Sequence, residues 1–466
     1  MEELKNYTFE DLSIGAAIEL NHVVTATDID MLSALSGDVA SFHAAQGDKA
    51  PGAHAVQAVC AVAMLSNIIT RRLPGPGSLI VDQRLKADGF VAQDDVLTAS
   101  LRIADKDAAN HTVLIEARVL NQHGAQLLVG SLRVAPPGSR GRFDDPARAA
   151  FYVPRKNVFQ RLYDACEGIP PVTTAVVHPC DRDALLGAIE AARKGLIEPV
   201  LIGPEAKIRA VAEEEGIDLS PYRIESVTHS HEAAERAVAL AREGKVEALM
   251  KGSLHTDELM GAVVKSATGL RTARRVSHVF VLDVPAYPRM LLVTDAAINI
   301  FPSIEDKVDI VQNAADLAHV LGIAEPRVAV LSAVETVTPK IQSTIDAAML
   351  CKMADRKQIT GCIIDGPLAF DNAVSEAAAK TKKIVSPVAG KADILLVPDL
   401  EAGNMVAKQL QYLAGADSAG IVLGARVPIV LTSRADPVAA RMASTAVMAL
   451  VAHYRRSGEI PLAHLP

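Results

Sequence analysis

The chain has 466 residues, of which 50% are apolar and 3% aromatic, with no tryptophan and a formal net charge of −8. This length exceeds what one hydrophobic core usually serves, so we expect two or three domains with cores of Ala, Val, Leu and Ile. The apolar content excludes a disordered chain, and the acidic balance gives no indication of nucleic-acid binding.

The cysteines and the apolar runs indicate the compartment. Five cysteines without any CxxC spacing argue against a zinc site or a disulfide framework. Met1 to Lys5 lack the basic and apolar regions of a signal peptide, and no apolar run approaches the roughly 20 residues of a membrane span. We therefore expect a cytoplasmic protein that contacts no membrane.

The first part of the chain predicts one helix and an antiparallel sheet. Apolar and polar residues alternate in four segments that turn residues separate, which is typical of strands. These segments are 78–86, 95–104, 111–121 and 126–136. The preceding segment, 53–69, is apolar on nearly every side, with Gln57, Ser66 and Asn67 as its few polar positions. Such a helix must be covered all round, so we expect the sheet to wrap around it.

Residues 1–137 contain several recognisable motifs, at 7–12 (YTFEDL), 25–29 (TATDI), 35–38 (LSGD), 73–78 (LPGPGS) and 121–124 (NQHG). These motifs resemble the MaoC-type (R)-specific enoyl-CoA hydratase family, which implies a hot-dog fold. The catalytic signature of that family, D-x-N-P-x-H, reads here from Asp38 to His43, with Ala40 and Ser41 in place of Asn and Pro.

The resemblance implies hydration of an enoyl thioester by this domain. Asp38 and His43 would hold one water, remove its proton and protonate the α-carbon. Backbone amides near Gly52, at the start of the predicted helix, would stabilise the enolate oxygen. The alternative is a non-catalytic module that binds acyl-CoA or forms a dimer.

Residues 138–160 form a predicted linker, because prolines, glycines and arginines occur there without periodicity. From residue 161 strands and helices alternate, and the continuous apolar character of the strands indicates a parallel sheet covered on both faces. The predicted strands are 174–177, 199–203, 222–227, 248–250, 277–283, 289–295, 328–331, 361–365, 394–398 and 428–431. The predicted helices are 181–194 with Asp181 as N-cap, 204–215, 230–243, 304–321, 338–354 and 437–455.

Polar loops follow three of these strands, where open α/β sheets bind ligands. After 428–431 come Ser433, Arg434 and Asp436, which offer a hydroxyl, a forked cation and a carboxylate. A second loop, after 394–398, contains Asn404. A third, after 248–250, is small and cationic, and Lys251, Ser253 and Thr256 could cradle a phosphate there. We therefore predict a phosphate site at these loops.

Residues 160–460 resemble the phosphate acetyl/butyryltransferase family. The motifs are 201–204 (LIGP), 250–256 (MKGSLHT), 293–299 (VTDAAIN), 334–335 (VE), 365–373 (DGPLAFDNA), 398–404 (PDLEAGN) and 433–436 (SRAD). The resemblance implies two α/β/α subdomains of the isocitrate/isopropylmalate dehydrogenase-like type, with a cleft between them and the last helix returning to the first subdomain. It also implies a homo-oligomer.

The implied reaction converts acyl-CoA and phosphate into acyl phosphate and CoA, without a metal or redox cofactor. Arg434 would bind phosphate, Ser433 would donate to the thioester or phosphate oxygen, and Asp436 would serve as base for the CoA thiol. In some acetyl-specific relatives that aspartate lies further along, where this chain has 439–441 (AAR). Asp365 and Asn404 are expected in the substrate-binding cleft without a specific role.

The sequence thus favours a bifunctional enzyme, a phosphate acyltransferase fused to an enoyl-CoA hydratase, over a transferase with a non-catalytic first domain. A dehydrogenase is a further alternative, because decarboxylating dehydrogenases share the implied cleft fold. However, no GxGxxG or GxxxxGK[ST] pattern occurs at a strand-to-helix turn, which argues against dinucleotide and nucleotide sites. The preferred acyl chain length stays open, because methylene-sized differences leave no motif.

Overall fold

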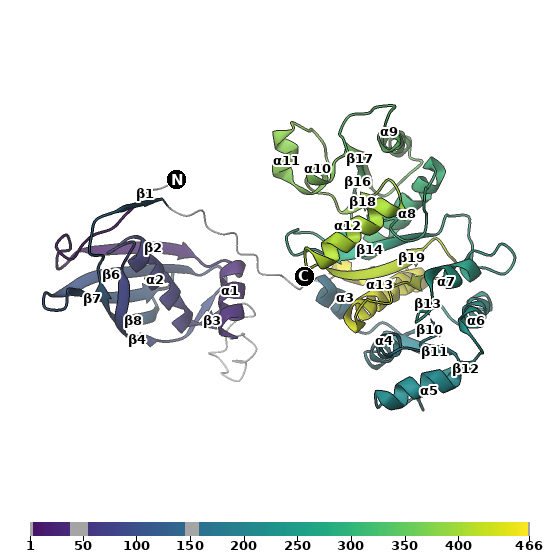
Figure 1. The fold of residues 1–466 in the computed structure, drawn as a ribbon, viewed down its shortest axis with the longest axis horizontal. Coiled ribbons are helices and arrows are strands. Elements are labelled where there is room, and N and C mark those ends of the chain that lie inside the picture. Colours follow the sequence, from purple (N-terminus) through teal and green to yellow (C-terminus); the bar gives the residue numbers. More distant parts are fainter. Residues whose placement is uncertain (1–2, 38–54, 145–157, 465–466) are drawn as a thin grey trace. The chain divides into compact units, whose positions relative to one another are not determined.

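The computed structural model describes residues 3–37, 55–144 and 158–464, which belong to two compact units, Met1–Val153 and Pro154–Pro466 (Figure 1). Residues in the first part of the predicted linker are ordered within the first unit, because β9 (Arg142–Asp144) pairs with β1 (Glu3–Lys5) in an antiparallel ribbon. The second unit begins, among the described residues, with α3 (Val158–Ala165).

The first unit is built on a five-stranded antiparallel sheet. Its strand order is β2 (Ala17–Val23), β6 (Val96–Asp107), β7 (Thr112–Leu120), β8 (Gln126–Ala135) and β4 (Leu79–Ala87). The four predicted strands are confirmed, and β2 adds a fifth at the edge beside β6. Helix α1 (Ala26–Ser36) follows β2 and is capped by Thr25 in a capping box.

The predicted helix 53–69 is wrong in its first part. Strand β3 (Ala55–Gln57) pairs with β5 (Phe90–Ala92), a 3-10 helix η2 (Ala58–Ala61) follows, and only α2 (Val62–Arg71) is α-helical. Leu65, Ile68 and Ile69 of α2 pack into the core with the inward side chains of β6, β7 and β8. The opposite face, with Asn67 and Thr70, is exposed. The sheet therefore covers one side of the helix, because these polar side chains make it amphipathic.

The second unit is organised on one eleven-stranded sheet. Its first half has the order β12 (Arg223–Ser226), β11 (Ile197–Gly203), β10 (Val172–Val177), β13 (Ala248–Lys251) and β20 (Ile429–Val430), all parallel. The other half has the order β15 (Leu291–Thr294), β18 (Ile394–Leu396), β16 (Arg327–Leu331) and β17 (Ile363–Leu368), again all parallel.

The two halves are joined by β19 (Asp417–Leu423) and β14 (Ser277–Asp283), which lie between β20 and β15. The contacts β20–β19, β19–β14 and β14–β15 are all antiparallel, so the two halves run in opposite directions. The prediction of a parallel sheet is therefore right within each half and wrong for the sheet as a whole. The adjacent pair of strands predicted after Arg275 is confirmed as β14 and β15.

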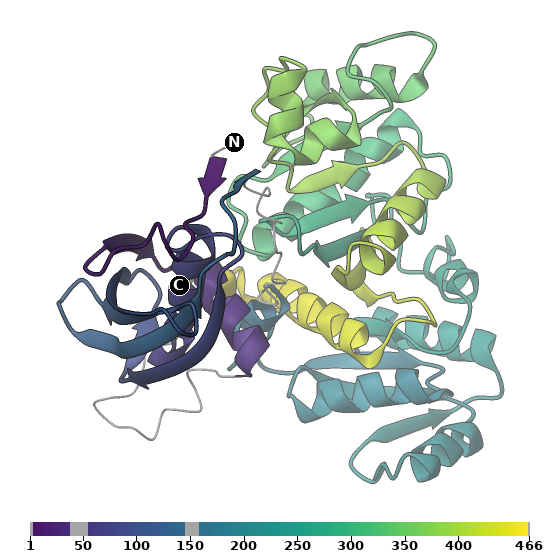
Figure 2. The ribbon, with the colours of Figure 1, turned by 60° about the vertical axis from the view of Figure 1, so that its left-hand side comes forward.

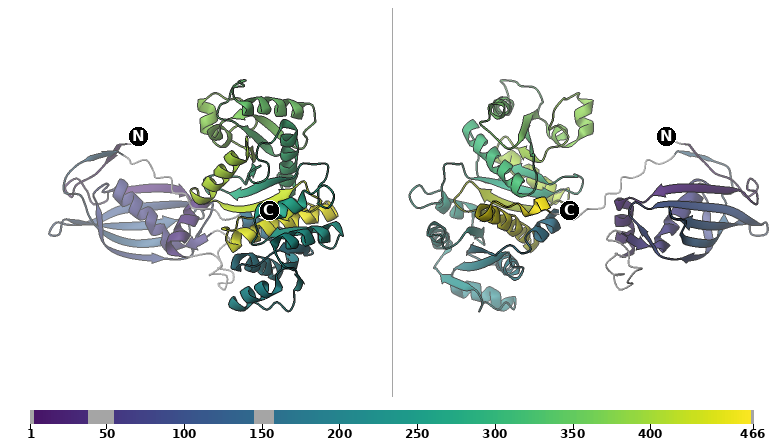
Figure 3. Two further views of the ribbon diagram at one scale, coloured as in Figure 1. Left: turned by 45° about the vertical axis from the view of Figure 1, so that its right-hand side comes forward. Right: turned by 180° about the vertical axis from the view of Figure 1, so that it is seen from behind.

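Helices cover both faces of this sheet (Figures 1 and 3). Alternate residues of a strand point to opposite faces of the sheet. Val176 and Val177 of β10 therefore contribute to different hydrophobic clusters. One face carries α3, α4 (Arg182–Arg193), α5 (Glu205–Glu214), α8 (Ile304–Val320), α9 (Gln342–Asp355) and α13 (Val438–Ser457). The other carries α6 (Ser230–Arg242), α7 (Thr256–Val263), α10 (Phe370–Val374), α11 (Glu376–Thr381) and α12 (Leu400–Tyr412).

Helix α13 crosses the middle of the unit and positions the loop before it. It is drawn in yellow in Figure 2, and it packs against α3, α4, β19 and β20. The N-cap role predicted for Asp181 is confirmed, because its side chain accepts from the Ala184 backbone at 2.8 Å. Helix α9 starts at Gln342 instead of residue 338, because Thr338–Ile341 form turns in which the Thr344 hydroxyl donates to both carbonyls. Within the described residues, no helix is long and apolar enough to cross a membrane.

Candidate active site

The loop after β20 presents Ser433 and Arg434 at the surface. Strand β20 pairs in parallel with β13, so the loop lies beside Lys251, the last residue of β13. Ser433 and Arg434 are exposed, whereas the flanking Thr432 and Asp436 are buried. The structure therefore brings together the predicted residues of two loops, with the hydroxyl and the guanidinium facing outward.

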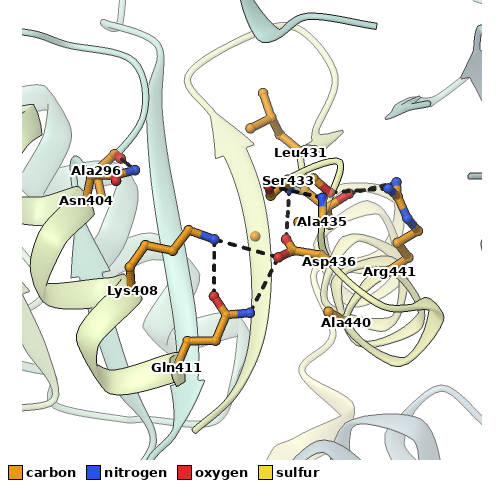
Figure 4. A network of polar contacts seen from close by, with 12 residues as sticks. Ala296, Asn404, Lys408, Gln411, Leu431, Ser433, Ala435, Asp436, Ala440 and Arg441 are labelled. Carbon is orange, nitrogen blue, oxygen red and sulfur yellow. Dashed lines mark hydrogen bonds and ion pairs between the residues drawn. The ribbon is translucent and has the colours of Figure 1, made fainter. Parts of the chain in front are cut away.

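Asp436 uses its carboxylate to hold this loop (Figure 4). The backbone N–H of Ser433 donates to its Oδ2 at 2.7 Å. Two side chains of α12 approach the other oxygen: Gln411 donates to Oδ1 at 3.4 Å, and Lys408 Nζ lies 3.7 Å from it. Because the residue is 3% exposed, both carboxylate oxygens face protein groups.

Lys251 and Arg441 place two buried cations beneath the loop. The Lys251 ammonium, on a residue 2% exposed, donates to the Thr432 carbonyl at 3.3 Å. Burial, together with the positive charges of Arg441 and Arg434, lowers the pKa of Lys251 to about 8. Arg441, in the first turn of α13, donates to the Thr432 hydroxyl, the Ser433 carbonyl and the Lys251 carbonyl.

Arg434 is the cation of this group that is free to meet a ligand. Its side chain makes no hydrogen bond or ion pair with any of the residues that the structure describes. A planar guanidinium with unused donors binds phosphate or carboxylate through two hydrogen bonds at once. The buried Lys251 adds a positive potential nearby. The arrangement therefore suits an anion placed over the Ser433–Arg434 segment.

The other predicted residues of the β13 loop have separate roles. The Ser253 hydroxyl donates to the His178 carbonyl at 2.9 Å and accepts from the Cys180 backbone at 3.1 Å, which ties this loop to the one after β10. Thr256 is the first residue of α7. His178 lies 3.3 Å from the same hydroxyl through Nδ1, and burial lowers its pKa. His178 belongs to none of the motifs that the sequence shows.

Asn404 and Asp365 lie on the other half of the sheet. Asn404, on α12, donates to the Ala296 carbonyl at 3.2 Å and so connects this helix to the loop after β15 (Figure 4). Asp365 lies on β17, six strand positions from β20, which is roughly 29 Å at about 4.8 Å per strand. The structure therefore does not bring Asp365 to the Ser433 loop.

A buried histidine supports the same loop from below. His278 on β14 is completely buried, and its Nε2 lies 3.3 Å from the Leu431 carbonyl, to which it can donate. Burial lowers the pKa of His278, which favours the neutral imidazole. Its Nδ1 has no hydrogen-bond partner among the described residues. A lone histidine within an apolar strand gave no usable signal in the sequence.

Three arginines at 271–275 line a hollow beside the loop after β15, together with Asn299 and Asp306. Arg274 pairs with Asp316, and Arg275 lies 3.4 Å from Asp306, so carboxylates already offset two of these charges. Neither Ser433 nor Arg434 lines this hollow. Within the described ranges, no group of His, Cys, Asp and Glu is arranged to hold a metal ion.

The residues predicted for the hydratase chemistry cannot be compared with the structure. Asp38, His43 and Gly52 lie outside the described residues.

The geometry of the second unit defines an α/β protein with a candidate anion site at the carboxyl ends of the parallel strands β13 and β20. Residues 225–449 match the family described as phosphate acetyl/butaryl transferase. A phosphate acetyltransferase of Rhizobium meliloti is 64% identical over 302 residues, which cover 65% of this chain and 96% of that protein. The chain belongs to the phosphate acetyl/butyryl transferase family.

Two solved structures extend the comparison. A branched-chain phosphotransacylase from Enterococcus faecalis V583 is 28% identical with a TM-score of 0.53, over 60% of this chain and 99% of that chain. The R-hydratase PhaJ1 from Pseudomonas aeruginosa is 23% identical with a TM-score of 0.29, over 32% of this chain and 98% of that chain.

Proposed function

We propose that the second unit transfers an acyl group between coenzyme A and inorganic phosphate. The observation that carries this proposal is the exposed Arg434, which pairs with none of the described residues, beside Ser433 and above the buried Lys251, in a chain of the phosphate acetyl/butyryl transferase family. The two oppositely directed halves of the sheet are the natural candidates for the two subdomains of an isocitrate/isopropylmalate dehydrogenase-like fold.

In the proposed reaction a phosphate oxygen attacks the carbonyl carbon of the thioester. The new C–O bond produces a tetrahedral intermediate with a negative oxygen, which then collapses as the C–S bond breaks. CoA leaves as a thiolate and takes up a proton, and the acyl phosphate remains. Each step concentrates negative charge, so the protein has to supply positive charge and hydrogen-bond donors.

The residues divide these tasks by position. Arg434 holds the phosphate with its two parallel donors, and the Ser433 hydroxyl donates to the thioester oxygen. Lys251 contributes positive potential from below the loop. The sequence predicts Asp436 as the base. We assign it the role of fixing the loop instead, because the Ser433 N–H and two α12 side chains occupy its oxygens.

The test is a phosphate-dependent CoA-release assay with acetyl-, propionyl- and butyryl-CoA on the full-length wild type and Arg434→Ala. We expect release that requires phosphate in the wild type, with a large loss in the variant. Removing a positioned electrostatic donor typically costs about 10²–10³-fold in rate. Unchanged phosphate dependence in Arg434→Ala would refute the site, and dinucleotide reduction without phosphate-dependent release would favour a dehydrogenase.

For the first unit we propose a hot-dog domain with enoyl-CoA hydratase activity. Two observations support it: the motif from Asp38 to His43, and the packing of α2 onto the antiparallel sheet. The alternative is a non-catalytic module that binds acyl-CoA or forms a dimer. Hydration of crotonyl-CoA by the full-length chain, abolished in Asp38→Asn but with transferase activity retained, is the expected result. Absence of any hydration would leave the binding or dimerisation module.

A further inference from the structure

Arg441 occupies a position where an arginine is electrostatically unfavourable. It is the largest of the fully buried side chains among the described residues, with 0% exposure. It is also the fourth residue of α13, near the N-terminus of the helix, where the helix dipole disfavours positive charge. Burial lowers the pKa of its guanidinium. A buried charge is normally offset by a carboxylate, but within the described residues none lies at ion-pair distance from Arg441.

The acceptors of Arg441 are neutral groups that surround the candidate site. One terminal nitrogen donates to the Thr432 hydroxyl at 3.0 Å and approaches the Lys251 carbonyl at 3.4 Å. The other donates to the Ser433 carbonyl at 3.2 Å (Figure 4). The guanidinium therefore links the loop after β20 to the end of β13, where Lys251 lies 190 residues before Arg441 in the chain.

These contacts fix the segment that carries the exposed site residues. The Ser433 N–H is held by Asp436, and the Ser433 carbonyl is held by Arg441. Because that carbonyl belongs to the Ser433–Arg434 peptide group, its orientation sets the direction in which both side chains leave the backbone. Helix α4 makes room for this arrangement: a Cβ on Gly187 would lie 2.9 Å from Cδ and 3.1 Å from Cβ of Arg441.

We propose that Arg441 is a positioning residue for the transfer reaction, which orients Ser433 and Arg434 through the Ser433 carbonyl without itself binding substrate. The inference rests on the proposed function of the second unit. It predicts that part of the effect of changes at Arg441 acts through Arg434, so that their effect becomes smaller when Arg434 is absent.

The test is a double-mutant cycle on the full-length chain, with kcat and KM for phosphate measured per folded molecule. Arg441→Met should lower kcat/KM on the order of 10²-fold, as small misplacements of catalytic groups do. In the Arg434→Ala background the same change should lower kcat/KM by a smaller factor. The two factors should differ by more than the roughly twofold deviation that independent sites show. Arg441→Lys, which keeps the charge but donates from one nitrogen, should fall between Met and wild type.

Two further variants separate positioning from general stability. Arg456→Met is the matched control, because Arg456 also lies on α13 and also donates to backbone carbonyls, those of Pro170 and Pro171. It lies roughly 22 Å along the helix from Arg441 at 1.5 Å per residue, so kcat/KM should stay within about twofold of wild type. Gly187→Ala keeps Arg441 but displaces it, and should lower kcat several-fold.

The outcomes distinguish the two proposals. Wild-type kcat/KM in folded Arg441→Met, or losses that multiply in the double variant, would overturn the positioning role alone. A wild type without phosphate-dependent CoA release would overturn the proposed function, and the inference would fall with it.

Discussion

The replacement of Asp436 by asparagine separates a positioning carboxylate from a catalytic base. The asparagine side-chain oxygen can still accept from the Ser433 N–H, which now lies 2.7 Å from Oδ2. What the variant loses is the negative charge, which faces Gln411 at 3.4 Å and Lys408 at 3.7 Å. We therefore expect the loop to keep its shape and the transferase to stay active.

The expected cost can be estimated from these contacts. A hydrogen bond to a charged acceptor contributes about 1 kcal/mol more than a neutral one, and the partly exposed pair with Lys408 adds up to about 1 kcal/mol. The sum, about 2 kcal/mol, lowers Tm by about 4 °C for a unit of this size. As a positioning variant, Asp436→Asn should keep kcat within about tenfold of wild type, whereas loss of a general base costs about 10²–10⁴-fold.

The assay compares Asp436→Asn with Asp436→Ala, by thermal unfolding and by phosphate-dependent CoA release on the folded protein. Asp436→Ala removes the acceptor of the Ser433 N–H, so it should lose both stability and most of kcat. A base would make the two variants equally inactive. A fall of more than 10²-fold in Asp436→Asn with unchanged Tm would refute the positioning role.

Three further predictions follow from buried groups. The pKa of Lys251, lowered by burial and then by neighbouring arginines to about 8, means that its charge destabilises the folded state below pH 8. Relative to Lys251→Met, the wild type should therefore gain unfolding free energy as pH rises from about 8 towards 10.5, which denaturant titrations will measure; a constant difference would refute it. Gly403→Ala should lower Tm despite the better helix propensity of alanine, because its Cβ would lie 2.9 Å from the Asp295 carbonyl. Asp346→Ala should cost about 3–5 kcal/mol in denaturant unfolding by leaving Lys307, now 2.6 Å away, buried and unpaired, and an additional Lys307→Met should recover part of it.

The loop from Thr432 to Asp436 could be predicted because its signal is local. An apolar strand ends, and a hydroxyl, a guanidinium and a carboxylate follow within five residues, which is enough to predict exposed polar groups at a strand end. The Asp181 cap was predictable for the same reason, because capping depends on the next few residues alone. Local patterns could not show that protein groups would occupy both carboxylate oxygens of Asp436. These contacts make a positioning role more consistent with the structure than the role of a base.

Strand β19 illustrates a failure of composition. It contains Ala419 and Gly420, residues with low strand propensity, so the segment gave no strand signal. The position of β19 in the middle of the sheet explains why residue 420 is a glycine: a Cβ at this position would lie 2.4 Å from the Leu431 carbonyl. The close approach of the loop after β20 requires glycine there. With β14, β19 makes the three antiparallel contacts that reverse the direction of the sheet.

Arg441 was missed because its contacts depend on the packing of α13 against the end of β13, where Lys251 lies 190 residues earlier, although a signal existed. Ser444, Thr445 and Met448, three, four and seven positions further along α13, are all buried, so the arginine stands on the inward face of its helix. A cation on an inward face must either be paired or serve a site. This pattern predicts that Arg441 is either paired or part of a site, but it does not predict which loop Arg441 contacts.

The charges of the site explain why two buried cations are tolerated at one loop. Lys408 is offset by Asp436, whereas among the described residues no carboxylate lies at ion-pair distance from Lys251, Arg434 or Arg441. Asp181 and Asp436 attract both buried cations from further away. If phosphate binds at this loop as proposed, its negative charge would offset the positive charge that these carboxylates leave. The same positive charge would then act on the tetrahedral oxyanion, whose charge develops in the same place. In this view, binding of the substrate anion offsets the free-energy cost of burying Lys251 and Arg441. Asp436 has to stay hydrogen-bonded to the loop, because a free carboxylate at the site would cancel the positive potential that the reaction uses.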